Sequence, residues 1–361
     1  MKSKLLYLLH MPPPVHGASW VGKQIHESEA VHEAFDCRFI NLSTSEELAA
    51  IGRFGWRKVV AVRHLLRQIG KAPYADLAYV TPSATPPGFL KDYLVVRLLK
   101  RRGMKVVLHF HNKGVATHSE NPVFRFLYRR FFKDTRVILL SWTLYPDVAV
   151  YVPRESVSIC PNGIEPGPAG RPGGPDAEPR ILFLSNLIRT KGVDVLLEAC
   201  RILKERGCRF QYSLVGAASA DYPAGTLASA ISERDLDGLV TWSGGKYGAD
   251  KQAELQAADI FVFPTFYPKE CFPLVILEAM SAGLPVVSTP EGAIPDLVQD
   301  GVTGLLCKKK DPVSLADALQ RLLSDPELRR RMGAAGRSAV LESYTSRQFE
   351  TNLIHILYDA L

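Results

Sequence analysis

The chain has 361 residues and a net charge of +7, with 47% apolar and 22% charged residues. Its length suits two domains of about 150–180 residues each, and its average composition excludes a disordered or fibrous protein. The apolar run Leu5–Leu9 stops at His10, far short of a membrane span or a signal sequence, so we expect a cytoplasmic protein. The six cysteines form no Cys-x-x-Cys pair, which favours reduced thiols and argues against structural zinc.

Basic residues concentrate in the first half of the chain. Residues 1–165 hold 23 Lys and Arg against 13 Asp and Glu, a net charge of +10, whereas residues 166–361 hold 21 against 24, a net charge of −3. The segments 53–71, 97–102 and 125–133 mix basic and apolar residues at helical spacing. Such segments are ordinary amphipathic helices, or they attract an anionic membrane or a phosphate-bearing acceptor. No nucleic-acid-binding motif accompanies the charge, so no nucleic-acid partner is expected.

Short apolar runs alternate with longer helical patterns on both sides of residues 165–179, of which nine of fifteen are Pro or Gly. The alternation is typical of parallel βαβ units, so we predict an α/β fold with two parallel-sheet domains facing across a cleft. The Pro- and Gly-rich run predicts a linker. The predicted parts are a first domain (1–165), a linker (166–179), a second domain (180–345) and a final helix (346–361) that could pack back on the first domain or on the second.

The predicted strands of the first domain cover residues 4–9, 38–41, 77–81, 105–110, 136–140 and 157–160. Those of the second domain cover residues 180–185, 211–215, 239–242, 260–264, 285–288 and 304–307. Predicted helices include residues 19–34, 88–102, 193–206, 273–282 and 312–323. Ligands of such sheets bind at the carboxyl ends of the strands, so we expect functional residues in the loops that follow strands.

In the first domain, the strand at 105–110 ends in polar residues. Because side chains alternate along a strand, His109 and His111 share a face.

Residues 17–24 come close to the sequence of a phosphate-binding P-loop. They lack the Ser or Thr that binds magnesium, so we reject that interpretation.

In the second domain, the strand at 180–185 enters a loop that ends on Lys191 before a helix. Lys191 and Arg189 on such a loop could neutralise a diphosphate leaving group, although Arg189 is equally compatible with a solvated surface position. Gly216 and Gly244 follow strands and could let the backbone approach a nucleotide, and plain turns explain them equally well.

The sequence pattern of residues 263–287 predicts a strand, a loop, a helix with a helix-ending signal, and a second strand. Pro273 suits the first turn of a helix that ends at Gly283. The N–H groups at the start of that helix, together with its dipole, favour a phosphate or diphosphate. Glu270 precedes the helix and Glu278 lies within it, and carboxylates beside such a ligand would accept hydrogen bonds from a sugar hydroxyl and a ribose hydroxyl. The alternative is a capping Glu270 and a solvated Glu278.

Seven residues separate Glu270 from Glu278, and Ala-Met-Ser-Ala-Gly-Leu-Pro-Val-Val follows directly. This segment resembles the two-glutamate signature of the retaining nucleotide-sugar glycosyltransferases of family 4. Those enzymes have the GT-B fold, which consists of two Rossmann-like domains. Further matching pieces are residues 161–165, 181–192, 214–216 and 257–264, so the resemblance covers nearly the whole chain.

The resemblance implies a role for each candidate residue. Glu270 would lie near the donor sugar, Glu278 near the nucleotide ribose, and backbone amides around Phe272 to Val275 would hold the diphosphate. His111 would line the sugar site, and Gly17 would lie on a loop that approaches donor and acceptor. This chain has Asn186 at the position where the family usually has an arginine. The predicted catalytic residues are His111, Lys191 and Glu270, and the predicted donor-binding residues are Gly17, Asn186, Arg189, Gly216, Gly244, Phe272, Pro273, Leu274, Val275 and Glu278.

The resemblance implies retaining transfer of a sugar from a nucleotide diphosphate sugar to an acceptor hydroxyl, with no cofactor besides the donor. Asp235 and Asp237 match a metal-binding pattern of other transferases but lie far in sequence from the glutamates, so we predict no metal. The basic first half favours a lipid-linked or glycan acceptor of bacterial cell-surface polysaccharide or lipopolysaccharide biosynthesis, with peripheral contact at the inner membrane surface. A soluble small-molecule acceptor, and a degenerate protein that binds nucleotide sugar without transferring it, are the alternatives.

Overall fold

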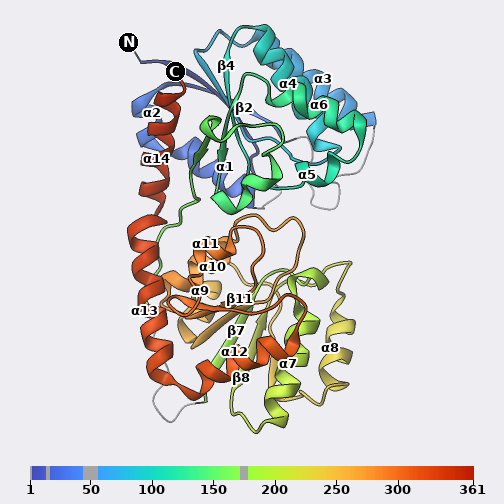
Figure 1. Ribbon diagram of the computed structural model, residues 1–361, viewed down its shortest axis with the longest axis vertical. Coiled ribbons are helices and arrows are strands. Elements are labelled where there is room, and N and C mark those ends of the chain that lie inside the picture. The colour runs from blue at the N-terminus through green and yellow to red at the C-terminus, as the bar shows by residue number, and fades with distance from the viewer. Residues whose placement is uncertain (1, 14–16, 44–55, 171–177) are drawn as a thin grey trace. The chain divides into compact units, whose positions relative to one another are not determined.

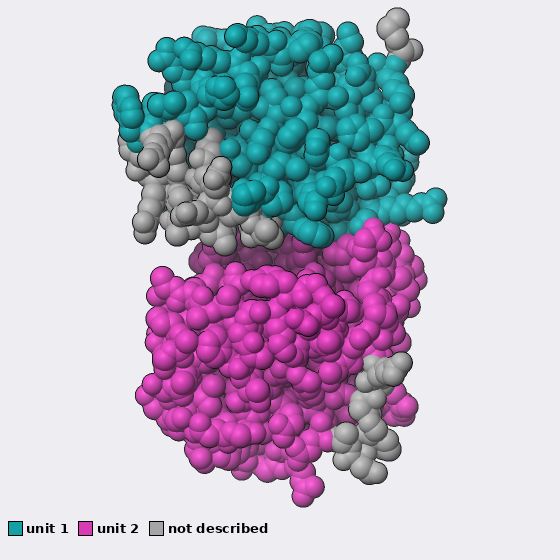
Figure 2. All heavy atoms as spheres, turned by 180° about the vertical axis from the view of Figure 1, so that it is seen from behind, with its two compact units in different colours: residues 1–163, 346–361 teal, residues 164–345 magenta. Residues whose placement is uncertain are grey.

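The computed structural model describes residues 2–13, 17–43, 56–170 and 178–361 (Figure 1). The chain divides into two compact units, which Figure 2 shows in different colours. Unit 1 contains residues 1–163 together with 346–361, and unit 2 contains residues 164–345. The fold class is confirmed, because each unit holds a six-stranded parallel sheet covered by helices.

The sheet of unit 1 has the strand order β2-β1-β3-β4-β5-β6. Its strands are β1 (Lys4–Leu9), β2 (Asp36–Asn41), β3 (Leu77–Val80), β4 (Lys105–His109), β5 (Arg136–Leu139) and β6 (Val157–Ile159). Its helices are α1 (Gly17–Glu27), α2 (Glu29–Ala34), α3 (Trp56–Lys71), α4 (Gly88–Arg101), α5 (Val115–His118), α6 (Pro122–Phe132), α14 (Ser346–Asp359) and the 3₁₀ helices η2 (Trp142–Asp147) and η3 (Arg154–Ser156).

Two apolar layers sandwich this sheet. Leu6 and Leu8 of β1 point into a cluster with α3, α4 and α6, whereas Tyr7 points to the other face, with α1, α2 and α14. This is the alternation expected of a strand that is buried on both faces. Figure 1 shows α3, α4 and α6 together on one side of unit 1, and α2 beside α14. The final helix α14 packs on unit 1 through Phe349, Leu353 and Leu357, which lie in the same cluster as Tyr7.

The sheet of unit 2 has the strand order β12-β11-β10-β7-β8-β9. Its strands are β7 (Arg180–Leu184), β8 (Gln211–Val215), β9 (Val240–Trp242), β10 (Ile260–Phe263), β11 (Val286–Ser288) and β12 (Gly304–Leu306). Its helices are η4 (Arg189–Lys191), α7 (Val193–Glu205), α8 (Ala224–Ser232), α9 (Gly248–Ala257), α10 (Leu274–Ser281), α11 (Ile294–Leu297), α12 (Pro312–Ser324) and α13 (Pro326–Ser343).

Apart from shifts of one or two residues at the ends of elements, the described elements differ from the predicted ones in two places. The helix predicted at 19–34 is broken at Ser28, whose hydroxyl accepts from the Val31 N–H and thereby begins α2 as an N-cap. Within the run predicted as a linker, residues 171–177 lie outside the described residues, but the part before them packs on unit 2. There the Gly167 N–H donates to the Ser281 hydroxyl at 2.9 Å, and the Gly170 N–H donates to the Ala282 carbonyl at 2.7 Å.

Candidate functional site

The connection of the strands in unit 2 reverses between β7 and β10. From β7 the chain continues to β8 and β9 on one side, and it then returns to β10 on the other side of β7. The loops after β7 and β10 therefore diverge at the carboxyl edge of the sheet, which is where ligands of open parallel sheets bind. Residues 185–192 form the first loop and residues 264–273 the second, and they carry Lys191 and Glu270.

A buried ion pair joins these two loops. Lys191 Nζ donates to Glu270 Oε2, and only 14% and 9% of the two side chains are exposed. The Thr265 hydroxyl lies 3.5 Å from the same carboxylate oxygen. The ammonium also lies 5.1 Å from the ring centroid of Phe263 and 4.9 Å from that of Tyr267. A charge that is held among aromatic faces and shielded from water acts more strongly on a ligand than an exposed charge does.

Backbone contacts fix the relative position of the two loops. The Phe266 N–H donates to the Thr190 carbonyl at 2.8 Å. Gly192 has a φ of +91°, and a Cβ on this residue would meet the Pro264 carbonyl oxygen at 2.3 Å. Only glycine meets both conditions, because it accepts a left-handed conformation and leaves room for the neighbouring backbone. Lys191 is thus anchored on both sides, by the Thr190 contact and by a residue that must be glycine.

Helix α10 begins at Leu274, one residue later than predicted. Pro273 is its N-cap, with a ψ of 106° in the extended region, and no side chain caps the helix. In the first turn, the N–H groups of Leu274 and Val275 have no acceptor within the helix, whereas the Ile276 N–H donates to the Pro273 carbonyl at 3.1 Å. Phe272 and Pro273 are buried, whereas Leu274 and Val275 are partly exposed. This helix start therefore has the features of an anion site, directly after Glu270 in the chain.

Glu278 lies in α10 and pairs with a residue that the sequence did not suggest. Its Oε1 accepts from Lys251 Nζ of α9 at 2.7 Å. Its Oε2 is buried and, within the described part of the chain, has no hydrogen-bond partner. A buried carboxylate oxygen without a partner is costly, and a ligand hydroxyl would supply the missing donor. This arrangement fits the predicted contact of Glu278 with a ribose.

The two remaining candidates of the first loop differ in their surroundings. Asn186 is exposed. The Arg189 guanidinium is bound at 2.9 Å by Asp194 and lies 4.9 Å from the Tyr222 ring centroid, and half of the Arg189 side chain is exposed. The structure therefore brings Lys191 and Glu270 together but places Arg189 in a separate ion pair.

Gly216 lies where the ends of β7 and β8 come closest. A Cβ on this residue would sit 1.8 Å from the Ser185 carbonyl oxygen. Its N–H donates to the Gly244 carbonyl at 2.8 Å, and its carbonyl accepts from Trp242 Nε1 at 2.9 Å. Gly244 has a φ of +72° in the adjoining loop. The glycine at 216 thus serves close packing of three loops, and its backbone N–H is already used within the protein.

We expect Gly216→Ala to lower the melting temperature of the protein by about 5 °C or more, because the added methyl group must displace backbone rather than a flexible side chain. Gly225→Ala is the matched control, since a Cβ at Gly225 in α8 meets nothing within 4 Å. Thermal unfolding of both variants measures the difference. Equal melting temperatures would contradict the packing described at Gly216.

In unit 1, His111 follows the carboxyl end of β4. Its ring centroid lies 4.2 Å from that of His109, and His109 Nδ1 is 2.6 Å from the Tyr79 hydroxyl. Burial, and then the proximity of His111, hold the pKa of His109 well below its usual range, so His109 is neutral and supports His111 from within the core. Gly17 is the first residue of α1, and a Cβ there would meet nothing within 4 Å. Gly17 thus begins a helix, although it was predicted to lie on a loop, and residues 14–16 before it lie outside the described residues.

Asp235 and Asp237 lie in the turn before β9, at the amino edge of the sheet and thus at the edge opposite Lys191 and Glu270. Asp235 pairs with Lys204 at 2.7 Å, and Asp237 accepts from the Ser232 hydroxyl at 3.0 Å. In the described ranges, three or more His, Cys, Asp or Glu side chains are nowhere gathered in a way that could hold a metal ion.

Sequence reasoning missed three residues that support the site. Thr265 and Tyr267 lie between β10 and Glu270, and their position in a loop after a strand was the available signal. Burial, and then the charge of Glu270, raise the pKa of Tyr267, so this phenol stays protonated. Lys251 had no such signal, because it lies in a helix and meets Glu278 only in the folded chain.

The carboxyl edge of unit 2 thus combines a shielded ammonium, an uncapped helix start and two carboxylates. An ammonium and backbone N–H groups bind phosphate oxygens, and carboxylates accept hydrogen bonds from sugar hydroxyls. This edge of the sheet suits a ligand that carries a diphosphate between two hydroxyl-bearing groups.

Comparison with known proteins agrees with this description. The family described as glycosyl transferases group 1 matches residues 171–339. The amylovoran biosynthesis glycosyltransferase AmsK of Erwinia amylovora is 31% identical over 75% of this chain and 67% of its own length. The putative colanic acid biosynthesis glycosyltransferase WcaL of Escherichia coli K12 is 33% identical over 67% of this chain and 60% of its own length.

Solved structures show the same fold. The crystal structure of Anabaena HepE in complex with UDP and glucose matches 99% of this chain and 99% of its own, with a TM-score of 0.73 and 18% sequence identity. At this identity the match establishes the GT-B fold and no more. Together, the family match, the relatives and the fold confirm the resemblance found in the sequence: the chain belongs to the group 1 glycosyl transferases.

Proposed function

We propose that the protein transfers a sugar from a nucleotide diphosphate sugar to an acceptor hydroxyl, with the donor bound at the carboxyl edge of the unit 2 sheet. The pair of Lys191 and Glu270 next to the uncapped start of α10 is the observation that carries this proposal. The donor's diphosphate would contact Lys191 and the N–H groups of the first helical turn. The complex of HepE with UDP and glucose provides a precedent within the same fold.

The two glutamates would hold the ends of the donor. The buried, unpartnered Oε2 of Glu278 would accept from a ribose hydroxyl, while Lys251 keeps Oε1 occupied. Glu270 would accept from hydroxyls of the transferred sugar and keep Lys191 in place. His111 of unit 1 would supply a further contact to the sugar, as the family resemblance implies.

The proposed reaction retains the configuration at the anomeric carbon. As the bond between the sugar and the diphosphate breaks, negative charge grows on the leaving phosphate, and Lys191 with the helix start would stabilise that charge. The leaving phosphate would then take the proton of the acceptor hydroxyl, which attacks from the same face of the sugar. No carboxylate nucleophile is required, in contrast to the retaining glycosidases. The anomeric configuration of the isolated product, measured by NMR, tests retention, and an inverted product would contradict it.

We further propose that the acceptor is a lipid-linked or glycan intermediate of bacterial cell-surface polysaccharide synthesis, and that transfer takes place at the inner surface of the cytoplasmic membrane. The name of AmsK assigns it to the biosynthesis of amylovoran, and that of WcaL describes a putative glycosyltransferase of colanic acid biosynthesis, which supports a role of this chain in polysaccharide synthesis. The net charge of +10 in residues 1–165 supports an anionic acceptor or membrane. No helix among the described residues is long and apolar enough to cross a membrane. Transfer to lipid-linked acceptors extracted from membranes, compared with transfer to soluble sugars, tests this assignment.

Transfer is expected to proceed without a divalent metal. Lys191 and the first turn of α10 would supply the positive charge that a metal ion supplies in other transferases. Initial rates with EDTA should therefore equal those with magnesium to within about twofold. A chelator-dependent loss that magnesium restores would show that a metal ion does part of this work.

A further inference from the structure

Three helices of unit 1 share one direction and one face. Helices α3, α4 and α6 each lie between two strands of a parallel sheet, so they run the same way. Hydrogen bonds join their carboxyl-terminal ends: Lys100 Nζ donates to the Phe131 carbonyl at 2.8 Å, and the Arg102 guanidinium donates to the carbonyls of Ile69 and Ala72. Figure 1 shows the three helices grouped on one side of unit 1. Burial lowers the pKa of Lys100 to about 8, consistent with its structural position beneath this face.

The outward side chains of these helices change character along their length. Near the amino-terminal ends several of them are exposed and apolar, namely Trp56, Val59 and Val60 on α3, Leu90 and Leu94 on α4, and Val123 and Phe126 on α6. Basic residues also occur there, namely the exposed Arg125 on α6 and, in the sequence of α3, Arg57 and Lys58. Toward the carboxyl-terminal ends they are exposed and basic, namely Arg63, Arg67 and Lys71 on α3, Arg97 and Arg101 on α4, and Arg129 and Arg130 on α6. Helices α3 and α6 contain no acidic residue, and Asp92 of α4 is fully buried and paired with Lys91.

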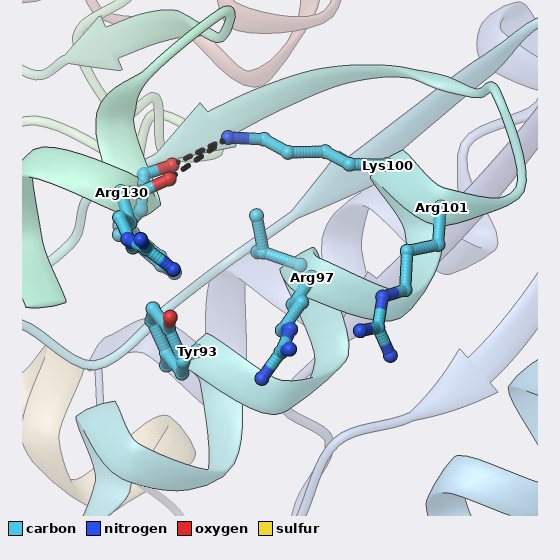
Figure 3. Close-up of a pocket in the computed structure, with 7 residues that line it drawn as sticks. Tyr93, Arg97, Lys100, Arg101 and Arg130 are labelled. Atoms are coloured by element: carbon cyan, nitrogen blue, oxygen red, sulfur yellow. Dashed lines mark hydrogen bonds between the residues drawn. The ribbon is translucent and has the colours of Figure 1, made fainter.

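A hollow of about 290 Å³ lies at the basic end, between α4 and α6. It is lined by Arg97, Arg101 and Arg130 together with Tyr93, Val96 and Phe131, and Figure 3 labels the three arginines and Tyr93 around it. Lys100 also borders the hollow, but its ammonium is bound to backbone carbonyls. The three guanidinium groups, by contrast, form no ion pair with any carboxylate of the described residues. The Arg130 guanidinium lies 4.6 Å from the ring centroid of Phe126, a contact that does not neutralise its charge. The positive charge of the three groups therefore remains available to an anion.

We infer that the outward face of α3, α4 and α6 docks on an anionic phospholipid bilayer, with a lipid phosphate bound in the hollow between α4 and α6. Guanidinium groups bind phosphate through paired hydrogen bonds, which suits the three arginines that line the hollow. The exposed apolar side chains at the other end would enter the boundary between headgroups and acyl chains. A soluble phosphate would account for the arginines but not for the exposed apolar side chains, whereas an anionic bilayer accounts for both.

This inference deepens the proposed function, on which it rests for the membrane location of the acceptor. The apolar ends of the three helices lie toward the carboxyl edge of the unit 1 sheet, because helices that connect parallel strands run opposite to them. That edge carries His111, just beyond β4. The face would therefore bring the edge of unit 1 that holds His111 close to the bilayer that carries the acceptor.

Flotation with vesicles tests the docking face. The variant Arg97→Gln, Arg101→Gln, Arg130→Gln is compared with wild-type protein on vesicles of phosphatidylcholine alone and on vesicles that also contain phosphatidylglycerol. The matched control Arg209→Gln, Arg321→Gln, Arg331→Gln removes the same charge from exposed positions of unit 2. We expect the first variant to bind the anionic vesicles about 100-fold more weakly than wild type, and the control to lose less than about threefold.

Equal losses of vesicle binding in the two variants would show a response to net charge alone and would overturn the assignment to this face. Wild-type protein that does not bind the anionic vesicles would overturn it as well. Unfolding temperature and donor binding in vesicle-free solution separate these outcomes from misfolding and from failure of the proposed function. If the arginine variant is unstable, vesicle binding of the double variant Leu94→Gln, Phe126→Gln at the apolar end tests the inference in its place. Those changes should weaken vesicle binding at high salt, and unchanged binding would overturn the inference.

Discussion

Glu270→Gln is expected to lower kcat for sugar transfer by about 100-fold or more. The glutamine keeps the size of the side chain but removes the charge that pairs with Lys191, so the ammonium loses its fixed position. It also weakens the hydrogen bonds to the sugar hydroxyls that the proposed function assigns to this carboxylate. Steady-state rates at saturating donor measure the effect. Transfer that stays within a few-fold of wild type would exclude Glu270 from the reaction.

The control for this prediction is Glu254→Gln. Glu254 is also a buried carboxylate with basic partners, Arg180 and Lys246, but Arg180 begins β7 and thus lies at the amino edge of the sheet. Removing either charge destabilises the protein by breaking a buried pair, so the two variants should show comparable losses in unfolding temperature. Only Glu270→Gln should lose catalysis, which separates a direct role in transfer from a general loss of stability.

Glu278→Gln is expected to raise the donor KM by about 10- to 100-fold and to change kcat much less. The predicted loss corresponds to a hydrogen bond between a ribose hydroxyl and a charged acceptor. Because Glu278 Oε2 has no partner in the described part of the protein, the substitution removes no internal hydrogen bond at that atom. The substitution does weaken the partly exposed ion pair between Oε1 and Lys251. Unfolding temperature without nucleotide should therefore fall less than in Glu270→Gln, whose ion pair is more deeply buried. A fall in kcat with unchanged KM would contradict the assignment to the ribose.

A nucleotide analogue sharpens this test. Wild-type protein should bind the natural nucleoside diphosphate more tightly than its 2′,3′-dideoxy form, and Glu278→Gln should bind both alike. Lys251→Met should reduce the same discrimination in part, because Lys251 fixes the Glu278 carboxylate through Oε1. Discrimination that survives in Glu278→Gln would place the ribose elsewhere.

Much of the fold follows from local sequence patterns. All twelve predicted strands overlap observed ones, with ends that differ by no more than two residues. Strands such as Val106–Leu108 are buried on both faces and leave a continuous apolar run in the sequence. The break at Ser28 was missed because the apolar pattern continues through it, and only the N-cap geometry ends one helix and begins the next.

The candidate site could be predicted only in part. Lys191 and Glu270 follow strands that become neighbours in a parallel sheet, so the carboxyl-edge rule brings them to one place. The partners of Arg189 and Glu278 could not be predicted, because Asp194 and Lys251 reach them through side-chain packing between elements. The reason for glycine at position 216 was also hidden, since it lies in the Ser185 carbonyl of a different loop.

Thermal unfolding of wild-type, Lys191→Met and Glu278→Gln protein with UDP, GDP, dTDP and ADP, each without and with magnesium, tests the donor site most directly. A bound nucleotide stabilises the folded state by an amount that grows with the logarithm of its concentration relative to its Kd. We predict that one nucleotide raises the unfolding temperature of wild-type protein without metal, and that either substitution abolishes most of this shift. Stabilisation by none of the four nucleotides, or a shift that both variants retain in full, would contradict a nucleotide-sugar site at the carboxyl edge of unit 2.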